Sequence, residues 1–210
     1  MNYLLNNFDY ILQLTFQHFQ LSILPVGIAF LIALPLGWLI HRFPRLANFL
    51  IPLNNILYTI PSIALMIFLI PFFGLNARSV MVALVIYSQI ILLRNILAGF
   101  RGIDPSIIEA ARGMGMSRFQ MALRIQIPLA LPIILAGVRL ASVISVAIAT
   151  IGAKFGAGGL GVLLFEGIAQ AGRMDKIWIG AIFVGLLALF FNRGILGIEK
   201  MVSGRWMQAR

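Results

Sequence analysis

The sequence predicts an all-α, polytopic transmembrane protein with about five spanning helices. Its 210 residues are 61% hydrophobic and only 10% charged, which is too little charge to cover the surface of a water-soluble domain of this size. Two long segments, 10–40 and 46–77, carry no charged residue at all. About 20 apolar residues cross the hydrocarbon core as a helix, and a helix satisfies all of its backbone groups inside lipid. A bundle of spanning helices is therefore expected.

The spans and loops are expected to form one transmembrane domain, 1–210. The five spanning helices are placed at roughly 21–40, 50–72, 79–99, 129–151 and 177–198. Residues 1–20 mix apolar and polar side chains, so we expect an interfacial N-terminal segment ahead of the first span. The two long connections should then lie on opposite sides of the membrane. We expect a cytoplasmic hairpin over 100–128 and an external loop over 152–176.

Lysine and arginine are distributed unevenly between the two sets of loops. Nine lie in one set, namely Arg42, Arg45, Arg101, Arg112, Arg118, Arg124, Lys200, Arg205 and Arg210. Four lie in the other set, namely Arg78, Lys154, Arg173 and Lys176. Positive residues concentrate on the cytoplasmic side, so we expect a multi-pass protein of the cell membrane with its N-terminus outside and its C-terminus in the cytoplasm. The net charge of +10 then indicates loops that face anionic membrane lipid rather than a nucleic-acid partner.

Enzyme chemistry is not expected in this chain. The absence of cysteine excludes a thiol nucleophile and cysteine-based metal sites. The phosphate-binding pattern G-x4-G-K-[ST] does not occur, so the chain is not expected to hydrolyse ATP. The two histidines, His18 and His41, stand alone and are typical of residues near the membrane interface. We therefore predict no catalytic residue, no metal site and no cofactor in this chain.

The segment 101–132 is too basic and too broken to cross the membrane. Its first helix can begin in either of two ways. Asp104 can be the N-cap with Pro105 in the first helical position, or Ser106 and Glu109 can form a capping box one register later. The sequence leaves both possibilities open.

A second helix, 117–125, is expected after a turn at Gly113 and Gly115, since glycine favours helix C-termini. Ser117 is its predicted N-cap. An apolar stripe follows at i, i+4 and i+8, and it consists of Phe119, Leu123 and Ile127. From spacing alone, a structured docking element and an ordinary positive loop with two amphipathic turns are equally good interpretations.

The residues from Glu109 to Pro128 read E-A-A-x3-G-x9-I-x-I-P. This pattern resembles the EAA motif of ATP-binding-cassette importer permeases, with Ile127 in place of the family's leucine. The resemblance implies the type I importer permease fold and a coupling helix that inserts into a groove of a cytoplasmic ATPase. The coupling residues that it implies are Glu109, Ala110, Ala111, Arg112, Gly115, Met116 and Ser117.

The same resemblance implies an assembly of several subunits. Two permease copies, identical or paralogous, would form the pore, and a separate substrate-binding protein would deliver the solute. ATP and Mg²⁺ would bind to the partner ATPase, so hydrolysis would take place there. This chain would be the transport component alone.

Further stretches resemble permeases for glycine betaine, carnitine, choline and related quaternary amines. They are ALPLGWLIHR (33–42), YTIPSIALMIFLIPFFGL (58–75), LLRNILAGFRGIDPSIIEAARGMGMS (92–117), IPLALPIILAGVRLA (127–141) and GAGGLG (156–161). This resemblance covers nearly the whole chain and implies import of an osmoprotectant. Methionine-type permeases share parts of the pattern, so a methionine or other small-solute permease is the alternative. An ATP-independent transporter is less favoured, because all six acidic residues lie outside the expected spans.

Seven residues are candidates for the solute path or its gate, namely Tyr58, Thr59, Pro61, Ser62, Arg139, Ser142 and Ser145. Pro61 interrupts the second span, and a kink there can free carbonyls to line a cavity, although proline kinks also serve packing. Arg139 lies near the middle of the fourth span. It is either a contact on the path or between two copies, or a structural arginine bonded to polar neighbours. The serines can equally be small residues that let helices pack closely.

Three further features receive simpler interpretations. Arg94 and Arg193 lie nearer the ends of their spans, where a long side chain reaching the membrane surface accounts for them without a role in transport. The glycine-rich stretch 156–161 fits either a flexible gate or a plain turn. Charged residues of the external loop are candidates for contact with the binding protein, namely Glu166, Arg173, Asp175 and Lys176.

Overall fold

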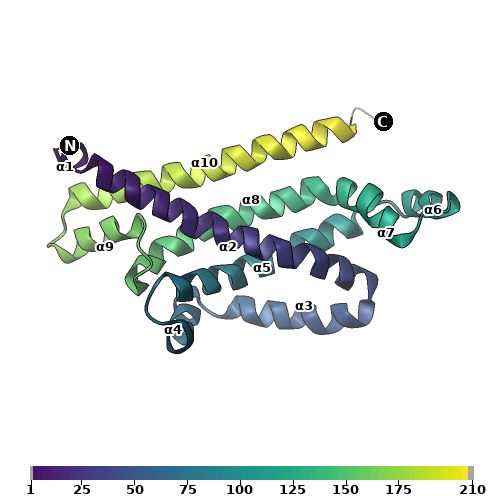
Figure 1. Cartoon of the computed structure of the whole chain (residues 1–210), viewed down its shortest axis with the longest axis horizontal. Coiled ribbons are helices and arrows are strands. Elements are labelled where there is room, and N and C mark those ends of the chain that lie inside the picture. The colour runs from purple at the N-terminus through teal and green to yellow at the C-terminus, as the bar shows by residue number, and fades with distance from the viewer. Residues whose placement is uncertain (1, 208–210) are drawn as a thin grey trace.

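The computed structural model describes residues 2–207, and these form ten α-helices and no strand. In chain order the helices are α1 (Asn2–Asn6), α2 (Phe8–Arg42), α3 (Pro44–Thr59), α4 (Ser62–Phe73), α5 (Ala77–Arg101), α6 (Pro105–Gly113), α7 (Arg118–Met121), α8 (Ile127–Gly152), α9 (Gly161–Ala169) and α10 (Met174–Met207). The long helices run back and forth in Figure 1, with α6 and α7 at one end and α1 and α9 at the other. We call these the hairpin end and the loop end. The all-α prediction is confirmed.

The number of membrane passes agrees with the prediction. Within the described residues, four helices are long and apolar enough to cross a membrane, and the number is five when the bent pair α3–α4 is counted as one span. The four continuous spans are Phe8–Arg42, Ala77–Arg101, Arg118–Phe155 and Met174–Val202. The helix α1 and the C-terminal end of α10 lie at opposite ends of the bundle, as five crossings require (Figure 1).

The helix that contains the first span begins earlier than the predicted residue 21, because α2 starts at Phe8. Residues 8–20 therefore continue the first long helix rather than forming a helix of their own. Two polar side chains of this stretch, Gln17 and His18, have partners inside the protein. His18 is fully buried and contacts α8 and the chain ahead of α9. Ile11 and Leu14 are buried beside it in a cluster with Leu160 and Leu163.

The second pass is sharply broken. Its two helices, α3 and α4, meet at 99° across Ile60 and Pro61. Ile60 is extended, with φ −69° and ψ 123°, because a proline disfavours the helical conformation of the residue before it. The carbonyl of Ile60 instead accepts a hydrogen bond from the Tyr87 hydroxyl of α5. The kink anticipated at Pro61 is present, and a neighbouring helix satisfies the carbonyl that it frees.

The second hairpin helix and the fourth span, predicted as separate helices around Pro128, form one continuous helix. It runs from Arg118 to Phe155 and contains a π-helical turn at Ala122–Gln126. In that turn the Ile127 amide donates to the Ala122 carbonyl, five residues earlier. Pro128 has no amide hydrogen to donate, so a widened turn just before it lets the helix continue.

The core of the bundle lies where α5 packs between α2 and α8. Small residues bring these helices together. A Cβ atom on Gly137 of α8 would lie 2.5 Å from the Cβ of Asn95 on α5, and one on Gly37 of α2 would lie 2.5 Å from Cγ2 of Ile96. Close van der Waals packing through small residues is the main attraction between helices in lipid. The α2–α5–α8 core is therefore the scaffold that supports the hairpin and the broken pass.

Candidate coupling site and solute path

The first hairpin helix, α6, begins at a well-formed N-cap. The Asp104 carboxylate accepts a hydrogen bond of 2.9 Å from the Ser106 amide, and Pro105 occupies the first turn. This decides between the two possible starts in favour of Asp104. Asp104 has further interactions, so it is not only a cap.

The end of α6 and the start of α7 are also defined by local bonds. Gly115 has a left-handed φ of +76°, and the amides of Gly115 and Met116 donate to the carbonyls of Arg112 and Ala111 at 2.9 and 3.2 Å. This pair of bonds is the Schellman arrangement, which needs glycine at the turn. Ser117 and Gln120 then form a reciprocal capping box at α7. The predicted turn is confirmed at Gly115 and the predicted N-cap at Ser117.

The two alanines of the hairpin motif differ in exposure: Ala111 is buried and Ala110 is exposed. Ala111 is 1% exposed, whereas Glu109 and Ala110 beside it are exposed. Of the other coupling residues, Met116 is half-buried, and the exposed ones are Arg112, Gly115 and Ser117. Large apolar side chains are exposed next to them, namely Met114 at 72%, Phe119 at 67% and Leu123 at 50%. Phe119 and Leu123 of the predicted stripe thus face outward.

A basic hollow separates the hairpin from the end of α2. Its volume is about 650 Å³. It is lined by Trp38, His41 and Arg42 from α2, and by Arg112, Met116 and Arg118 from the hairpin. A second hollow of about 400 Å³ shares His41 and Arg112 and adds Glu109. Ala111 and Met121 are buried within the hairpin region, and the hollow lies between this region and the end of α2.

Four of the seven path candidates lie together at the break in the second pass. Tyr58, Thr59 and Pro61 are exposed and Ser62 is half-buried. Arg94 of α5 joins them, because its guanidinium donates to the Asn55 side chain at 2.6 Å and lies 5.2 Å from the centre of the Tyr58 ring. The explanation of Arg94 as a side chain reaching toward the membrane surface is thus incomplete, since it binds across to α3.

The other three candidates lie on α8, away from this break. Ser142 and Ser145 are buried and donate to the carbonyls of Val138 and Ser22, at 2.8 and 3.0 Å. Their contacts are those of small residues at a helix interface. Arg139 bonds to α10 instead, with Glu199 at 3.2 Å and Asn192 at 3.3 Å.

The partner of Arg139 belongs to the same helix as the last span. Glu199 was expected beyond that span, and α10 continues through it to Met207. An arginine in a membrane span needs a polar partner in the protein, and the carboxylate of Glu199 supplies one. Of the two interpretations, the structure supports a structural arginine, bonded to polar side chains of a neighbouring helix.

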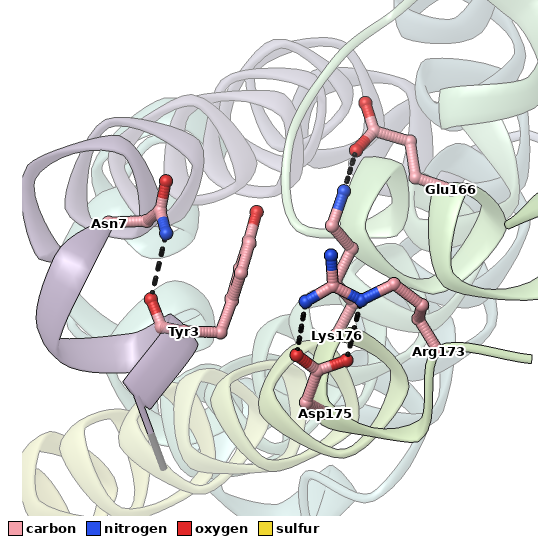
Figure 2. Close-up of polar contacts among 6 residues, drawn as sticks. All are labelled: Tyr3, Asn7, Glu166, Arg173, Asp175 and Lys176. Atoms are coloured by element: carbon pink, nitrogen blue, oxygen red, sulfur yellow. Dashed lines mark hydrogen bonds and ion pairs between the residues drawn. The ribbon is translucent and has the colours of Figure 1, made fainter.

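The charged residues of the loop end bind mainly to each other. Figure 2 shows Lys176 against Glu166, and Arg173 against Asp175. Both cations also lie 5.3 Å from the centre of the Tyr3 ring. The Asp175 carboxylate raises the pKa of Arg173 above its ordinary value. This cluster fastens α1, α9 and α10 to one another.

Sequence reasoning missed the role of Gln17 and His18. Gln17 accepts from the Gly159 amide and His18 Nδ1 from the Leu160 amide, both at 3.2 Å. His18 Nε2 lies 3.1 Å from the Val146 carbonyl, so it carries the hydrogen. Gly156, Gly158 and Gly159 all have left-handed φ values, which gives the glycine-rich stretch a fixed conformation around these side chains. The sequence feature that could have indicated this role is a histidine inside the long uncharged segment 10–40.

Replacing His18 with leucine (H18L) is expected to lower the free energy of unfolding by about 1–3 kcal/mol, because the Leu160 amide and the Val146 carbonyl lose their partner in a buried place. Thermal unfolding of the purified protein in detergent measures the change. The matched control is His41→Leu, since His41 is half-buried and has no hydrogen bond to another part of the described chain. Equal stabilities of H18L and the wild type would contradict this role.

Comparison with known proteins decides the family. Residues 12–204 match the model of the family described as binding-protein-dependent transport system inner membrane component. The chain belongs to this family. The match spans all five passes and the hairpin, so the permease is described by it almost from end to end.

Relatives of the permease have the quaternary-amine names that the sequence patterns suggested. It is 40% identical to the carnitine transport permease protein OpuCB of Listeria monocytogenes, over 90% of this chain and 86% of that one. It is 39% identical to the osmoprotectant import permease protein OsmW of Salmonella typhimurium, over 91% of each chain. It is 35% identical to the glycine betaine/carnitine/choline transport system permease protein OpuCD of Bacillus subtilis, over 96% and 88%.

The permease also resembles a solved structure. This is an inward-facing conformation of the MetNI methionine ABC transporter, with a TM-score of 0.86 over 91% of this chain and 95% of that one. The sequences are 20% identical, so the likeness shows the fold alone. The expected importer permease fold is confirmed.

Proposed function

We propose that this permease forms half of the membrane pathway of an ATP-binding-cassette importer that carries a quaternary amine such as glycine betaine, carnitine or choline. The hairpin α6–α7 is the observation that carries the coupling role. Each of its two helices begins at an N-cap, and Ala111 is buried while Glu109, Ala110 and Met114 are exposed. A rigid element with an exposed apolar and charged surface suits transmission of a movement from a partner.

The partner at the hairpin end is a cytoplasmic ATPase that binds ATP and Mg²⁺. Nine of the lysines and arginines lie in loops of this end or near the C-terminus, which supports a cytoplasmic hairpin end and an external loop end. The substrate-binding protein then docks at the loop end, which is built from α1, α9 and the glycine-rich stretch. ATP drives transport by binding one conformation of the assembly more tightly than the other.

The broken pass supplies the solute path. Asn55, Tyr58, Thr59 and Arg94 are all exposed, and lipid offers such groups no hydrogen bonds. They are therefore expected to face water or a second permease copy, identical or paralogous, in the assembled pore. Ser145 and Arg139 support the helices behind this surface through their contacts with α2 and α10, and Ser142 bonds within α8.

The names of the relatives favour a quaternary amine over methionine as the solute. The quaternary-amine permeases are 32–40% identical to this chain, whereas the likeness to the methionine transporter is one of fold. The test is uptake into vesicles that contain the permease, the ATPase and the binding protein, with radiolabelled glycine betaine, carnitine, choline or methionine outside.

The expected result is uptake of at least one quaternary amine that requires ATP at the hairpin end, with little uptake of methionine. The control is a set of vesicles with an ATPase variant that binds but cannot hydrolyse ATP. Uptake that continues without ATP would point to an ATP-independent transporter, and uptake of methionine alone would refute the quaternary-amine assignment.

A further inference from the structure

Arg94 is a cation in a membrane span whose contacts are all with neutral groups. It lies seven residues before the end of α5 at Arg101, or about 10 Å along the helix. Its side chain is exposed. In the described part of the chain it has a hydrogen bond to Asn55 and a place over the Tyr58 ring, but no ion pair with a carboxylate. A charge in a span is costly and marks a functional site by default.

The contrast with Arg139 makes this arrangement informative. Arg139 has a carboxylate partner within the chain, Glu199 at 3.2 Å. Arg94 has the side-chain amide of Asn55 at 2.6 Å, which positions the guanidinium without neutralising it. The charge of Arg94 therefore stays available for an anionic group that comes from outside the chain.

Arg94 and Tyr58 together match the two ends of a zwitterionic quaternary amine. Guanidinium binds carboxylate through two parallel hydrogen bonds, and a tyrosine ring attracts a quaternary ammonium group to its face. In this structure the guanidinium carbon of Arg94 lies over the Tyr58 ring, 5.2 Å from the ring centre. A carboxylate that draws Arg94 aside uncovers the ring for the ammonium group of the same molecule.

The position of the pair is fixed by the broken pass. Tyr58 lies two residues before Ile60, whose carbonyl is bound to Tyr87 on the same helix as Arg94. The two bonds from α5, one to Asn55 and one to Ile60, hold the last turn of α3 in place beside Arg94. The site is open and has few contacts, which suits a transport path, because a solute must leave such a site as readily as it enters.

We propose that Arg94 and Tyr58, with Asn55 as a positioning residue, form a transient binding site for quaternary amines that carry a carboxylate. Arg94 takes the carboxylate and Tyr58 the ammonium group. The site thus favours glycine betaine and carnitine over choline, which has a hydroxyl group in place of the carboxylate. This proposal rests on the proposed function, since it names a contact within that path.

The test measures initial uptake of glycine betaine and of choline by the complete transporter in vesicles. Arg94→Gln is expected to lower betaine uptake about tenfold or more, the effect of losing a charged hydrogen-bond partner, and to change choline uptake little. Tyr58→Leu is expected to lower uptake of both solutes, because both carry the ammonium group. Co-purification of the ATPase with each variant checks that the transporter still assembles.

Asn55→Asp separates binding from a structural role. The new carboxylate pairs with Arg94, so it keeps α3 attached to α5 but occupies the site. Betaine uptake is therefore expected to fall as it does in Arg94→Gln. The matched control is Arg193→Gln, because Arg193 is an exposed arginine of the span α10 with no cross-helix bond in the described chain; both solutes should enter as in the wild type.

The outcomes distinguish the two proposals. Equal loss of betaine and choline uptake in Arg94→Gln, or betaine uptake at the wild-type rate in Asn55→Asp, overturns the binding site. Wild-type uptake of choline without betaine overturns it as well. If the binding protein delivers betaine alone, Asn55→Asp decides, because a purely structural Arg94 tolerates that change. A complete transporter that moves neither of these solutes nor carnitine refutes the proposed function instead.

Discussion

An Ala110→Trp permease is expected to fold normally but to lose solute-stimulated ATP hydrolysis by its partner. Ala110 is exposed on α6, while Ala111 beside it is buried. Bulk at Ala110 therefore leaves the permease intact and blocks close approach of the ATPase. Removal of a central contact in an interface costs about 2 kcal/mol or more, so ATPase binding should weaken about thirtyfold. Binding of the purified ATPase to permease in nanodiscs measures this directly.

Two variants serve as controls for this result. Ala181→Trp places the same bulk at an exposed position of the span α10, where ATPase binding should be unchanged. Ala111→Trp is expected to disturb the hairpin itself, since Ala111 is 1% exposed, and should lower thermal stability. Wild-type ATPase affinity and hydrolysis in Ala110→Trp would contradict docking at the exposed face of α6.

Glu199→Lys is expected to destabilise the permease by separating α10 from α8. It leaves Arg139 facing a second cation inside the membrane. Loss of one partner from a buried ion pair costs about 3–5 kcal/mol, but the side chains of Arg139 and Glu199 are 30% and 21% exposed. A loss of about 1–3 kcal/mol is therefore expected, measured as the unfolding temperature in detergent and the yield of intact protein.

Restoring the pair in reverse supplies the check. The double variant Arg139→Glu with Glu199→Arg should recover part of the stability, because the two charges attract again at the same two positions. Arg193→Gln, which removes a cation of α10 without an ion pair in the described chain, should leave the unfolding temperature unchanged. A Glu199→Lys protein as stable as the wild type would show that the contact contributes little.

Local signals made the hairpin predictable. The caps and the turn act through atoms within a few residues in sequence. The pattern alone therefore located the turn at Gly115 and the start at Ser117, and it narrowed the first start to two neighbouring registers, of which the structure has Asp104. The number of passes was predictable for a similar reason, because hydrophobic length is a property of each segment. The outward direction of Phe119 was not predictable from the sequence, since the apolar side of a helix can face either a core or a partner.

Contacts between distant segments explain what the sequence did not reveal. His18 is buried because the chain at Leu160, 142 residues later, donates to it. The Ile60 carbonyl, freed by the predicted kink at Pro61, is bound by Tyr87 of α5, 27 residues later. Arg139 and Glu199, 60 residues apart, meet only because α10 continues beyond the predicted span. Arg94 was expected to reach toward the membrane surface, but its guanidinium binds the side chain of Asn55 on α3, 39 residues earlier.

Cross-linking from a single cysteine tests the coupling hairpin most directly, because the natural chain has no cysteine. Met114 is 72% exposed at the end of α6, and Met114→Cys can carry a short photoreactive maleimide in the complete transporter. Lys154→Cys, at the loop end, is the matched position. We expect Met114→Cys to cross-link to the ATPase and Lys154→Cys to cross-link to the binding protein. Cross-links from Met114→Cys to the binding protein would contradict the account, as would cross-links to the ATPase from Lys154→Cys alone.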